Sequence, residues 1–329
     1  MRYDDQDRES QNVEDRRDDR GGGGGFSIPG GGGRQIQIPM GGSGGFSITT
    51  LLIVGALMLF FGLNPLDILT GGGGPDLSNI PQMPRMDQGR PTAGPRPGME
   101  IPGLPGGQKQ SAEAAGSDEL GHFVRRVLAD TEDVWTKVFQ ASGQQYKTPT
   151  LVMFSRQTRT ACGPGMTQMG PFYCPLDQKV YIDLAFYEEL KRRFHAPGDF
   201  AQAYVVAHEV GHHVQNLLGI ADKVQQYREA NPRASNPIQV RMELQADCFA
   251  GVWAALNNQL KNRLQPGDIE AGLNAAAQIG DDMIQKQAQG YVVPESFTHG
   301  SSQQRQRWFK QGFESGNMQQ CDTFRARDL

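Results

Sequence analysis

The run Ala207–Gln215 contains the residues whose types and spacing most clearly indicate chemistry. His208 and His212 are four positions apart, so on a helix they project from one face, one turn above the other. Two imidazoles at that spacing can bind one zinc ion, and Glu209 can reach a water beside the ion and act as a general base. His213 points about 100° away round such a helix and is not expected to be a ligand. The chain has only 6 His, which disfavours the alternative of a surface helix with unrelated histidines.

A catalytic zinc needs a third protein ligand and an open position for water. Glu243 and Asp247 are again four residues apart on a second predicted helix and share a face. Their neighbours are largely apolar, which argues against the alternative of a solvated acidic face, because acids in an apolar helix need a partner. We predict that Glu243 completes the zinc site. Asp247 would accept a hydrogen bond from the outer ring nitrogen of a ligand histidine and so fix its tautomer.

A third cluster, Phe297–Arg305, precedes the last predicted helix. Amide hydrolysis passes through a tetrahedral oxyanion, which needs a second positive or hydrogen-bonding group beside the metal. His299 is a candidate for that group, and Arg305 could orient His299 or bind substrate carbonyls. The alternative is that Thr298 or Ser301 caps the helix and that His299 is merely nearby.

These motifs resemble known enzymes. H-E-x-x-H followed by E-x-x-x-D is similar to the gluzincin pattern of zinc peptidases. With Thr298-His299-Gly300 ahead of Arg305, the wider pattern resembles a bacterial membrane-anchored family of neutral zinc metallopeptidases. More distantly it resembles membrane zinc proteases that have a Thr-His-Pro segment after the third ligand. The closer resemblance runs from about Thr150 to Phe324, with a short match at Asn12–Arg17.

The resemblance implies a zincin-like domain, one zinc ion per chain and zinc-dependent hydrolysis, without specifying a substrate. It supports a role for His299, although Gly300 stands where the more distant proteases have proline. In peptidases of this type a strand edge beside the zinc helix pairs with an extended substrate. By analogy, the segment Pro171–Ile182 is the candidate for that edge.

The chain divides by composition into a low-complexity front and an ordinary globular back. It has 329 residues, with 42 Gly and 20 Pro that are concentrated before residue 110. Residues 1–45 are charged and then glycine-rich, which predicts a disordered N-terminal tail. Residues 64–116 are rich in proline and glycine and predict a linker. Residues 117–329 are expected to form the zinc metallopeptidase domain, a size that is ample for one core.

Residues 46–63 are an apolar stretch of 18 residues without charge. As a helix they would cover about 27 Å, just enough to span a bilayer core. A buried core helix is the alternative, but the neighbouring sequence could not form a core around it. We therefore predict a single transmembrane helix. Arg34 before it and Asp67 and Asp76 after it weakly favour a cytoplasmic N-terminus, which places the domain in the periplasm of a Gram-negative cell.

Hydrophobic periodicity in the globular part predicts an α+β fold that is mostly helical with a small sheet. A first helix begins near Ser117, and the zinc helix begins near Asp199. The other predicted elements are strands at 150–154 and 179–184 and helices near 185–194, 238–259, 269–287 and 301–312.

The chain has four cysteines, Cys162, Cys174, Cys248 and Cys321. An even number in a domain that we expect to be exported suggests disulfides. Cys162 and Cys174 are the natural local pair, which leaves Cys248 and Cys321. Free buried cysteines remain an alternative, above all for Cys248 in its apolar helix. A cysteine zinc site is disfavoured because the spacing C-x-x-C is missing.

A net charge of −4 and the lack of a basic stripe with aromatics give no indication of nucleic-acid binding. The sequence therefore predicts a membrane-tethered zinc metallopeptidase that acts on peptides or proteins. A zinc amidase with a non-protein substrate, such as the cell wall, and a zinc-stabilised binding or scaffold domain are the alternatives. Glu209 argues against the scaffold, because a structural zinc site is usually closed by four protein ligands and needs no base. The oligomeric state is not predicted.

Overall fold

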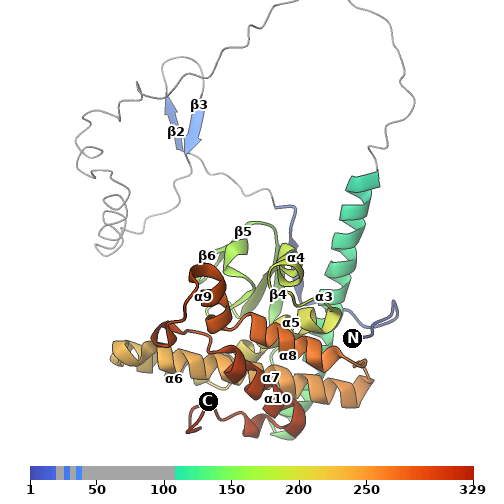
Figure 1. Cartoon of the computed structure of the whole chain (residues 1–329). Coiled ribbons are helices and arrows are strands. Elements are labelled where there is room, and N and C mark those ends of the chain that lie inside the picture. The colour runs from blue at the N-terminus through green and yellow to red at the C-terminus, as the bar shows by residue number, and fades with distance from the viewer. Residues whose placement is uncertain (20–25, 30–34, 39–107) are drawn as a thin grey trace, which may run out of the picture. The chain divides into compact units, whose positions relative to one another are not determined.

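The computed structural model describes residues 1–19, 26–29, 35–38 and 108–329 (Figure 1). Within these ranges, the first and the last belong to one compact unit, and the two short ranges between them belong to another. The short ranges are β2 (Phe26–Pro29) and β3 (Gln35–Ile38), which pair antiparallel. The first unit contains all the residues for which the sequence predicts chemistry.

This first unit is mostly helical with a small sheet, as predicted. Its helices are α3 (Gln108–Ala141), α4 (Ala185–Arg192), α5 (Asp199–Leu217), α6 (Ile220–Ala230), α7 (Ser235–Lys261), α8 (Asp268–Gln278), α9 (Asp281–Gln289) and α10 (Ser302–Ser315). Short 3-10 turns lie at Thr167–Met169, Pro232–Ala234, Pro294–Ser296 and Met318–Gln320. Where the sequence predicts one helix over residues 269–287, the structure has α8 and α9. The helix is interrupted between them, where Gly280 has an extended backbone directly before α9.

Four strands form the sheet in the order β1-β4-β8-β7. Their bounds are β1 (Val13–Arg16), β4 (Thr150–Phe154), β8 (Lys179–Asp183) and β7 (Phe172–Cys174). β4 lies parallel to both β1 and β8, whereas β7 runs antiparallel to β8. A separate hairpin joins β5 (Gln157–Thr160) to β6 (Gly163–Met166). β4 and β8 are the two predicted strands, and β7 forms the edge of the sheet that contacts α5.

Helix α5 is buried along most of its length because it packs against the sheet, α3, α7 and α8. Gly211 allows the backbone of α7 to approach, since a Cβ added there would lie only 3.0 Å from the carbonyl oxygen of Ala246. At the crossing of α7 and α10, a Cβ on Gly312 would lie 1.9 Å from the carbonyl oxygen of Cys248. These two glycines bring the helices with the predicted functional side chains close together.

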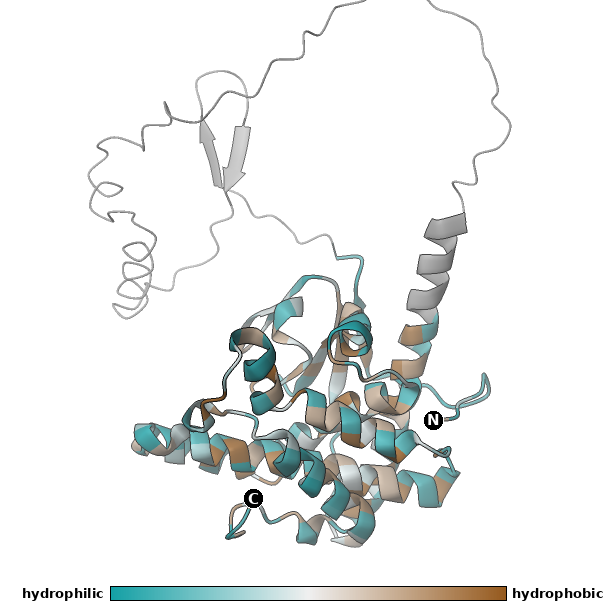
Figure 2. Cartoon of the chain, viewed as in Figure 1, coloured by the Kyte–Doolittle hydropathy of each residue, from teal (hydrophilic) through white to brown (hydrophobic). Residues whose placement is uncertain are grey.

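Large apolar side chains fill the space between α3, α5, α7 and α10. Trp135 packs edge-to-face on Phe249, and Phe200 stacks on Trp253. Truncating a buried aromatic of this kind to alanine typically costs about 3–5 kcal/mol. Figure 2 shows mostly hydrophilic residues on the visible sides of α9 and α10, which fits helices that bury only one face.

Both disulfides suggested by the sequence are present. Cys162, in the β5–β6 hairpin, is joined to Cys174 at the end of β7, with the Cα atoms 5.8 Å apart. Cys248 on α7 is joined to Cys321 in the C-terminal segment, with the Cα atoms 5.6 Å apart. The second bond holds the C-terminal segment against α7.

Residues 1–19 pack on the domain, so the prediction of a disordered tail over residues 1–45 is wrong for this part. β1 adds a strand to the sheet, with Val13 opposite Leu151. The composition of the segment misleads because its order comes from backbone pairing and ion pairs more than from apolar burial. The predicted linker also ends early, since α3 begins at Gln108.

Buried acidic groups hold this N-terminal segment. Glu132 on α3 accepts hydrogen bonds from Arg8 at 2.9 Å, Ser10 at 2.6 Å and Asn12 at 2.7 Å. Arg263, after α7, makes two bonds to Asp7, at 2.7 and 2.6 Å. The segment is therefore an integral part of the domain.

The predicted transmembrane helix at residues 46–63 lies outside the described residues. Among the helices that the structure does describe, none combines the length and apolar character needed to cross a membrane. The pairing of β1 with β4 conflicts with the predicted topology. A single crossing between them would put the two strands on opposite sides of a membrane, where they could not share a sheet.

Candidate metal centre

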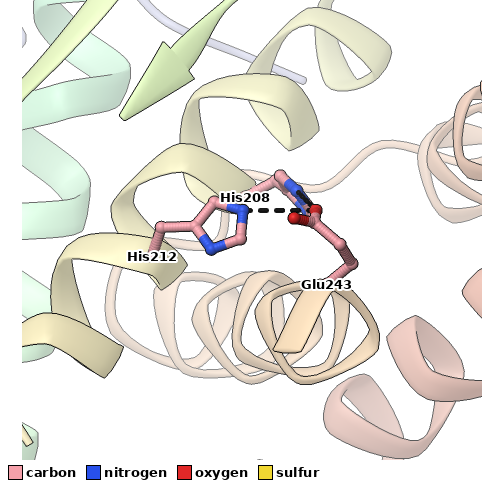
Figure 3. Close-up of side chains that lie close together, drawn as sticks. All are labelled: His208, His212 and Glu243. Carbon is pink, nitrogen blue, oxygen red and sulfur yellow. Dashed lines mark hydrogen bonds and ion pairs between the residues drawn. The ribbon is translucent and has the colours of Figure 1, made fainter. Parts of the chain in front are cut away.

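His208, His212 and Glu243 converge on one point between α5 and α7 (Figure 3). Their potential ligand atoms all lie within 4.8 Å of one another. Glu243 Oε2 is 3.2 Å from His208 Nε2 and 3.3 Å from His212 Nε2. Helical spacing explains the convergence, because the histidines are one turn apart on α5 and face the α7 turn that carries the glutamate.

The donor set fits zinc. Zinc is commonly bound by imidazole nitrogens and a carboxylate oxygen, and at the usual bond lengths two donors of a tetrahedral site lie about 3.4 Å apart. The distances from Glu243 Oε2 to the two imidazole nitrogens, 3.2 and 3.3 Å, match that spacing. Three protein donors would leave one position for water or substrate, as in catalytic zinc sites.

Asp247 holds His208, as the sequence predicts. Its Oδ1 lies 2.8 Å from His208 Nδ1, and it also accepts a hydrogen bond from the hydroxyl of Tyr204. Arg305 donates to both carboxylate oxygens, at 2.8 and 2.9 Å. Burial raises the pKa of Asp247, but the charges of Arg305 and His208 outweigh this effect and lower the pKa to about 2. The ionised carboxylate accepts the Nδ1 proton of His208 and leaves Nε2 to face Glu243.

Electrostatics within the cluster keep Glu243 ionised. Burial raises the pKa of Glu243, but the nearby imidazoles of His212 and His208 lower it well below its usual range. In turn, burial lowers the pKa of His208, whereas Asp247 and Glu243 raise it to about 10. The carboxylates of Glu243 and Asp247 thus stabilise positive charge at the imidazoles, and they would equally stabilise a metal cation that takes the place of the imidazole protons.

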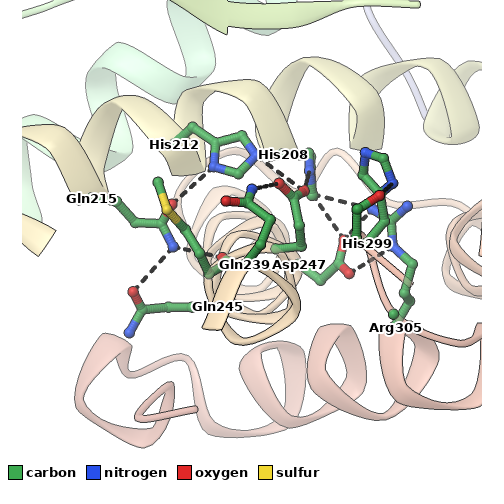
Figure 4. Close-up of polar contacts among 12 residues, drawn as sticks. His208, His212, Gln215, Gln239, Gln245, Asp247, His299 and Arg305 are labelled. Atoms are coloured by element: carbon green, nitrogen blue, oxygen red, sulfur yellow. Dashed lines mark hydrogen bonds and ion pairs between the residues drawn. The ribbon is translucent and has the colours of Figure 1, made fainter. Parts of the chain in front are cut away.

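Glutamine side chains hold the other two groups (Figure 4). His212 Nδ1 is 2.8 Å from Gln215 Oε1. Glu243 Oε1 accepts a 2.8 Å hydrogen bond from Gln239 Nε2, and Gln239 in turn accepts one from Arg228 at 3.0 Å. Sequence analysis missed these residues and Tyr204, which supports Asp247. Helical spacing could have indicated two of them, since residue 204 is one turn before His208 and residue 239 one turn before Glu243.

Glu209 and the three candidate ligands line one cavity of about 910 Å³. Glu209 is only 8 % exposed. Among the described residues its carboxylate accepts no hydrogen bond, so its oxygens can bind water or substrate. The strand β7 lines the same cavity through Phe172 and Tyr173.

His299 also lines this cavity, although its side chain is 51 % exposed. Asp281, at the start of α9, fixes the segment: its Oδ2 accepts the backbone N–H groups of Thr298, His299 and Gly300 at 2.6, 2.6 and 3.1 Å. Burial lowers the pKa of His299, but its hydrogen bond to Asp281 and the charge of Glu243 raise it above its usual value. Sequence analysis missed Asp281, which lies 18 residues before the histidine that it holds.

The sequence left open whether this segment caps the last helix or brings His299 to the site, and the structure shows both features. Ser301 caps α10 in a capping box with Gln304, and His299 nevertheless faces the cavity. Arg305 lines the cavity as well, but its hydrogen bonds are not those of a residue that orients His299, which was one of its two predicted roles. Its guanidinium is buried and donates to Asp247, the hydroxyl of Tyr204 and a backbone carbonyl. Its hydrogen bonds thus place it behind His208, and in the described part of the chain it makes none to His299.

His213 is a structural residue, as its position on the helix predicts. Its Nε2 is 2.6 Å from the carbonyl oxygen of Lys147, and its Nδ1 is 3.0 Å from the hydroxyl of Tyr173. Asn216 donates to that same hydroxyl at 3.0 Å. Burial lowers the pKa of His213 to about 4, which keeps the ring neutral near pH 7. These bonds tie the edge strand β7 to the helix that carries the candidate ligands.

Comparison with known proteins gives bacterial relatives. The chain is 45 % identical over 320 residues to the uncharacterised protein YpfJ of Escherichia coli (strain K12), which covers 96 % of both chains. It is 43 % identical over 225 residues to the uncharacterised protein Rv2575 of Mycobacterium tuberculosis (strain H37Rv), which covers 64 % of this chain and 74 % of that protein. No solved structure matches it.

The match to a described family spans nearly the whole chain. It covers residues 1–324 and therefore includes the N-terminal segment as well as the candidate metal centre. The chain belongs to the family described as "Putative neutral zinc metallopeptidase".

Proposed function

We propose that the protein is a zinc-dependent metallopeptidase of zincin-like fold that hydrolyses peptide bonds. The observation that carries this proposal is the convergence of His208, His212 and Glu243 on a cavity that Glu209 also lines, with a carboxylate that accepts no hydrogen bond from the described residues. A purely structural zinc site would not need that carboxylate or an open position. The family description supports a zinc hydrolase.

In this proposal each side chain has a distinct role. Zinc, when bound by His208, His212 and Glu243, supplies a Lewis acid that makes water acidic enough to ionise near neutral pH. Glu209 takes the proton from the attacking water and returns it to the leaving amine. His299, held by Asp281, donates a hydrogen bond to the oxyanion that forms from the scissile carbonyl.

The edge strand β7 supports a peptide substrate. Among the strands that the structure describes, β7 is hydrogen-bonded only to β8, and it lines the cavity beside the candidate ligands. An extended peptide could add to this edge as a further strand, with its scissile bond next to Glu209. The edge lies within the segment Pro171–Ile182 that the sequence indicates by analogy. A non-protein amide would have less use for such an edge, so the cell-wall amidase is the second candidate.

We also propose that the domain acts outside the cytoplasm, near a membrane. Two disulfides favour an oxidising compartment. The apolar residues 46–63 are our candidate for a membrane anchor. Because residues 1–19 share a sheet with the domain, we propose that both flanks of the anchor lie on one side of the membrane. This proposal differs from the topology predicted from the sequence, in which the N-terminus lies in the cytoplasm and the domain in the periplasm.

The test compares the full-length chain with its Glu209→Gln variant. A fragment from residue 117 onward would lack β1 and the start of α3, so the whole chain is needed. Both proteins are solubilised, loaded from a zinc buffer and incubated with a diverse peptide library, and the products are read by mass spectrometry. Cleavage by the wild type and a loss of about 10²–10⁴-fold in the variant, with equal zinc content, are expected. Zinc binding without cleavage by either protein would contradict the proposal.

A further inference from the structure

A hydrogen-bonded chain runs from His212 to the C-terminal segment through two buried glutamines (Figure 4). Gln215 Oε1 lies 2.8 Å from His212 Nδ1. Gln215 Nε2 donates to the carbonyl oxygen of Met242 at 2.7 Å and to Gln245 Oε1 at 3.1 Å. Gln245 Nε2 then donates to the carbonyl oxygen of Cys321 at 2.9 Å. Gln215 is fully buried and Gln245 is 6 % exposed.

The backbone carbonyls of Met242 and Cys321 determine the direction of each hydrogen bond in this series. A backbone carbonyl can only accept, so the NH₂ groups of Gln215 and Gln245 must point to Met242 and Cys321 respectively. Gln215 therefore presents its oxygen to His212. That oxygen can accept only if Nδ1 carries the proton, which leaves the lone pair of His212 on Nε2 toward Glu243.

We propose that Gln215 is a positioning residue that fixes the tautomer and the ring orientation of His212 for metal binding. Met242 directly precedes Glu243, so the same amide also holds the backbone next to the third candidate ligand. One side chain thereby sets the position of two ligands that come from different helices. The inference rests on the proposed function, in which zinc binds His208, His212 and Glu243.

The two histidines are thus supported by different chemistry. His208 donates to the carboxylate of Asp247, which an arginine neutralises, whereas His212 donates to a neutral amide. A carboxylate at position 215 would retain an acceptor for Nδ1 but would lose both NH₂ donors. Substitutions at this position can therefore separate support of the imidazole from simple bridging between α5 and α7.

The test measures zinc affinity by chelator competition in the full-length chain and in three variants. Gln215→Leu removes the acceptor and should raise the zinc Kd by about 10–100-fold. Gln215→Glu keeps the acceptor and should recover most of that affinity. Gln245→Leu is the matched control. It removes the next side-chain amide in the hydrogen-bonded series but leaves Gln215 bonded to Met242 and His212. It should change the Kd less than threefold.

A second readout follows the proton itself. In the zinc-loaded protein with ¹⁵N-labelled histidine, the Nδ1–H resonance of His212 should be visible in the wild type and in Gln215→Glu. It should be lost or exchange rapidly in Gln215→Leu. A merely structural glutamine would leave this resonance unchanged.

The outcomes separate the two proposals. Wild-type zinc affinity in Gln215→Leu, or an equal loss in Gln245→Leu, would overturn the role of Gln215 alone. Zinc bound tightly by the wild type without peptide cleavage would count against the peptidase only. A wild-type chain that binds no zinc would overturn both.

Discussion

Arg305 and Asp247 form a bidentate ion pair across α10 and α7, with their side chains only 3 % and 0 % exposed. The same carboxylate accepts the proton of His208 Nδ1. The guanidinium of Arg305 therefore compensates the buried negative charge of Asp247. Without it, the carboxylate would more readily take up a proton and could no longer accept one from His208. Arg305, which lies 97 positions after His208 in the sequence, thus helps to define which nitrogen of that ring is free.

Arg305→Leu should destabilise the protein by about 3–5 kcal/mol, because it leaves Asp247 buried without its counter-charge. The free energy of unfolding by urea measures the effect. Arg307→Leu is the matched control on the same helix, since Arg307 is exposed and should cost less than about 0.5 kcal/mol. Equal free energies of unfolding for the two variants would show that the ion pair between Arg305 and Asp247 does not stabilise the fold around the site.

Tyr173→Phe should weaken substrate binding more than zinc binding. The hydroxyl of Tyr173 connects β7 to His213 and Asn216, so its removal frees the substrate edge from α5 and costs about 1–3 kcal/mol. We expect a higher KM with unchanged zinc Kd. Tyr181→Phe on β8 is the control, because its hydroxyl bonds Asp177 instead. A fall in zinc affinity in Tyr173→Phe would contradict this division.

The stability that Asp7 provides should depend on pH below about 4. Burial raises the pKa of Asp7, but its hydrogen bonds to Arg263 and to the backbone outweigh this, so its pKa is lower in the folded protein than its ordinary value of 3.8. A carboxyl group with a lowered folded pKa stabilises fully above its unfolded pKa and loses that effect as the pH falls through the folded pKa. Unfolding of the wild type and of Asp7→Asn, compared from pH 6 to pH 3, should converge at the acid end. A constant difference over that range would refute the assignment.

Reporters fused to the two ends of the chain should be found in the same compartment. β1 and β4 share backbone hydrogen bonds, so residues 1–19 and 108–329 cannot fold together across a bilayer. Alkaline phosphatase and a cytoplasmic fluorescent protein, each fused in turn to either end, give the readout. Opposite locations for the two ends would mean that β1 is not paired in the cell.

Much of the candidate metal centre could be predicted from the sequence because its main residues lie one helical turn apart. His208 with His212 and Glu243 with Asp247 need only a correct helix assignment and an apolar neighbourhood. Gln215 also lies within one turn of His212 on α5, but its hydrogen bonds to Met242 and Gln245 depend on how α5 meets α7. Asp281 could not be found from local spacing, because its contacts depend on how α9 meets the segment before α10.

The N-terminal segment illustrates a different limit. Residues 1–19 are polar and are followed by glycines, so local composition predicts disorder. Their order depends on Glu132 and Arg263, which lie more than 120 positions away in the sequence. A parallel partner strand at this separation leaves no local signal, because its pairing requires neither a turn nor a periodic pattern nearby.

Pairing of β1 with β4 also affects self-association. Leu151, Val152 and Met153 of β4 are fully buried, and without β1 the backbone of this apolar strand would become an open edge. Such edges recruit strands from other molecules, whereas β1 is short and has the charged sequence Val-Glu-Asp-Arg, which resists further pairing. The first residues of the chain therefore act as a cover against aggregation, and a protein shortened at its N-terminus should oligomerise through the bared edge of β4.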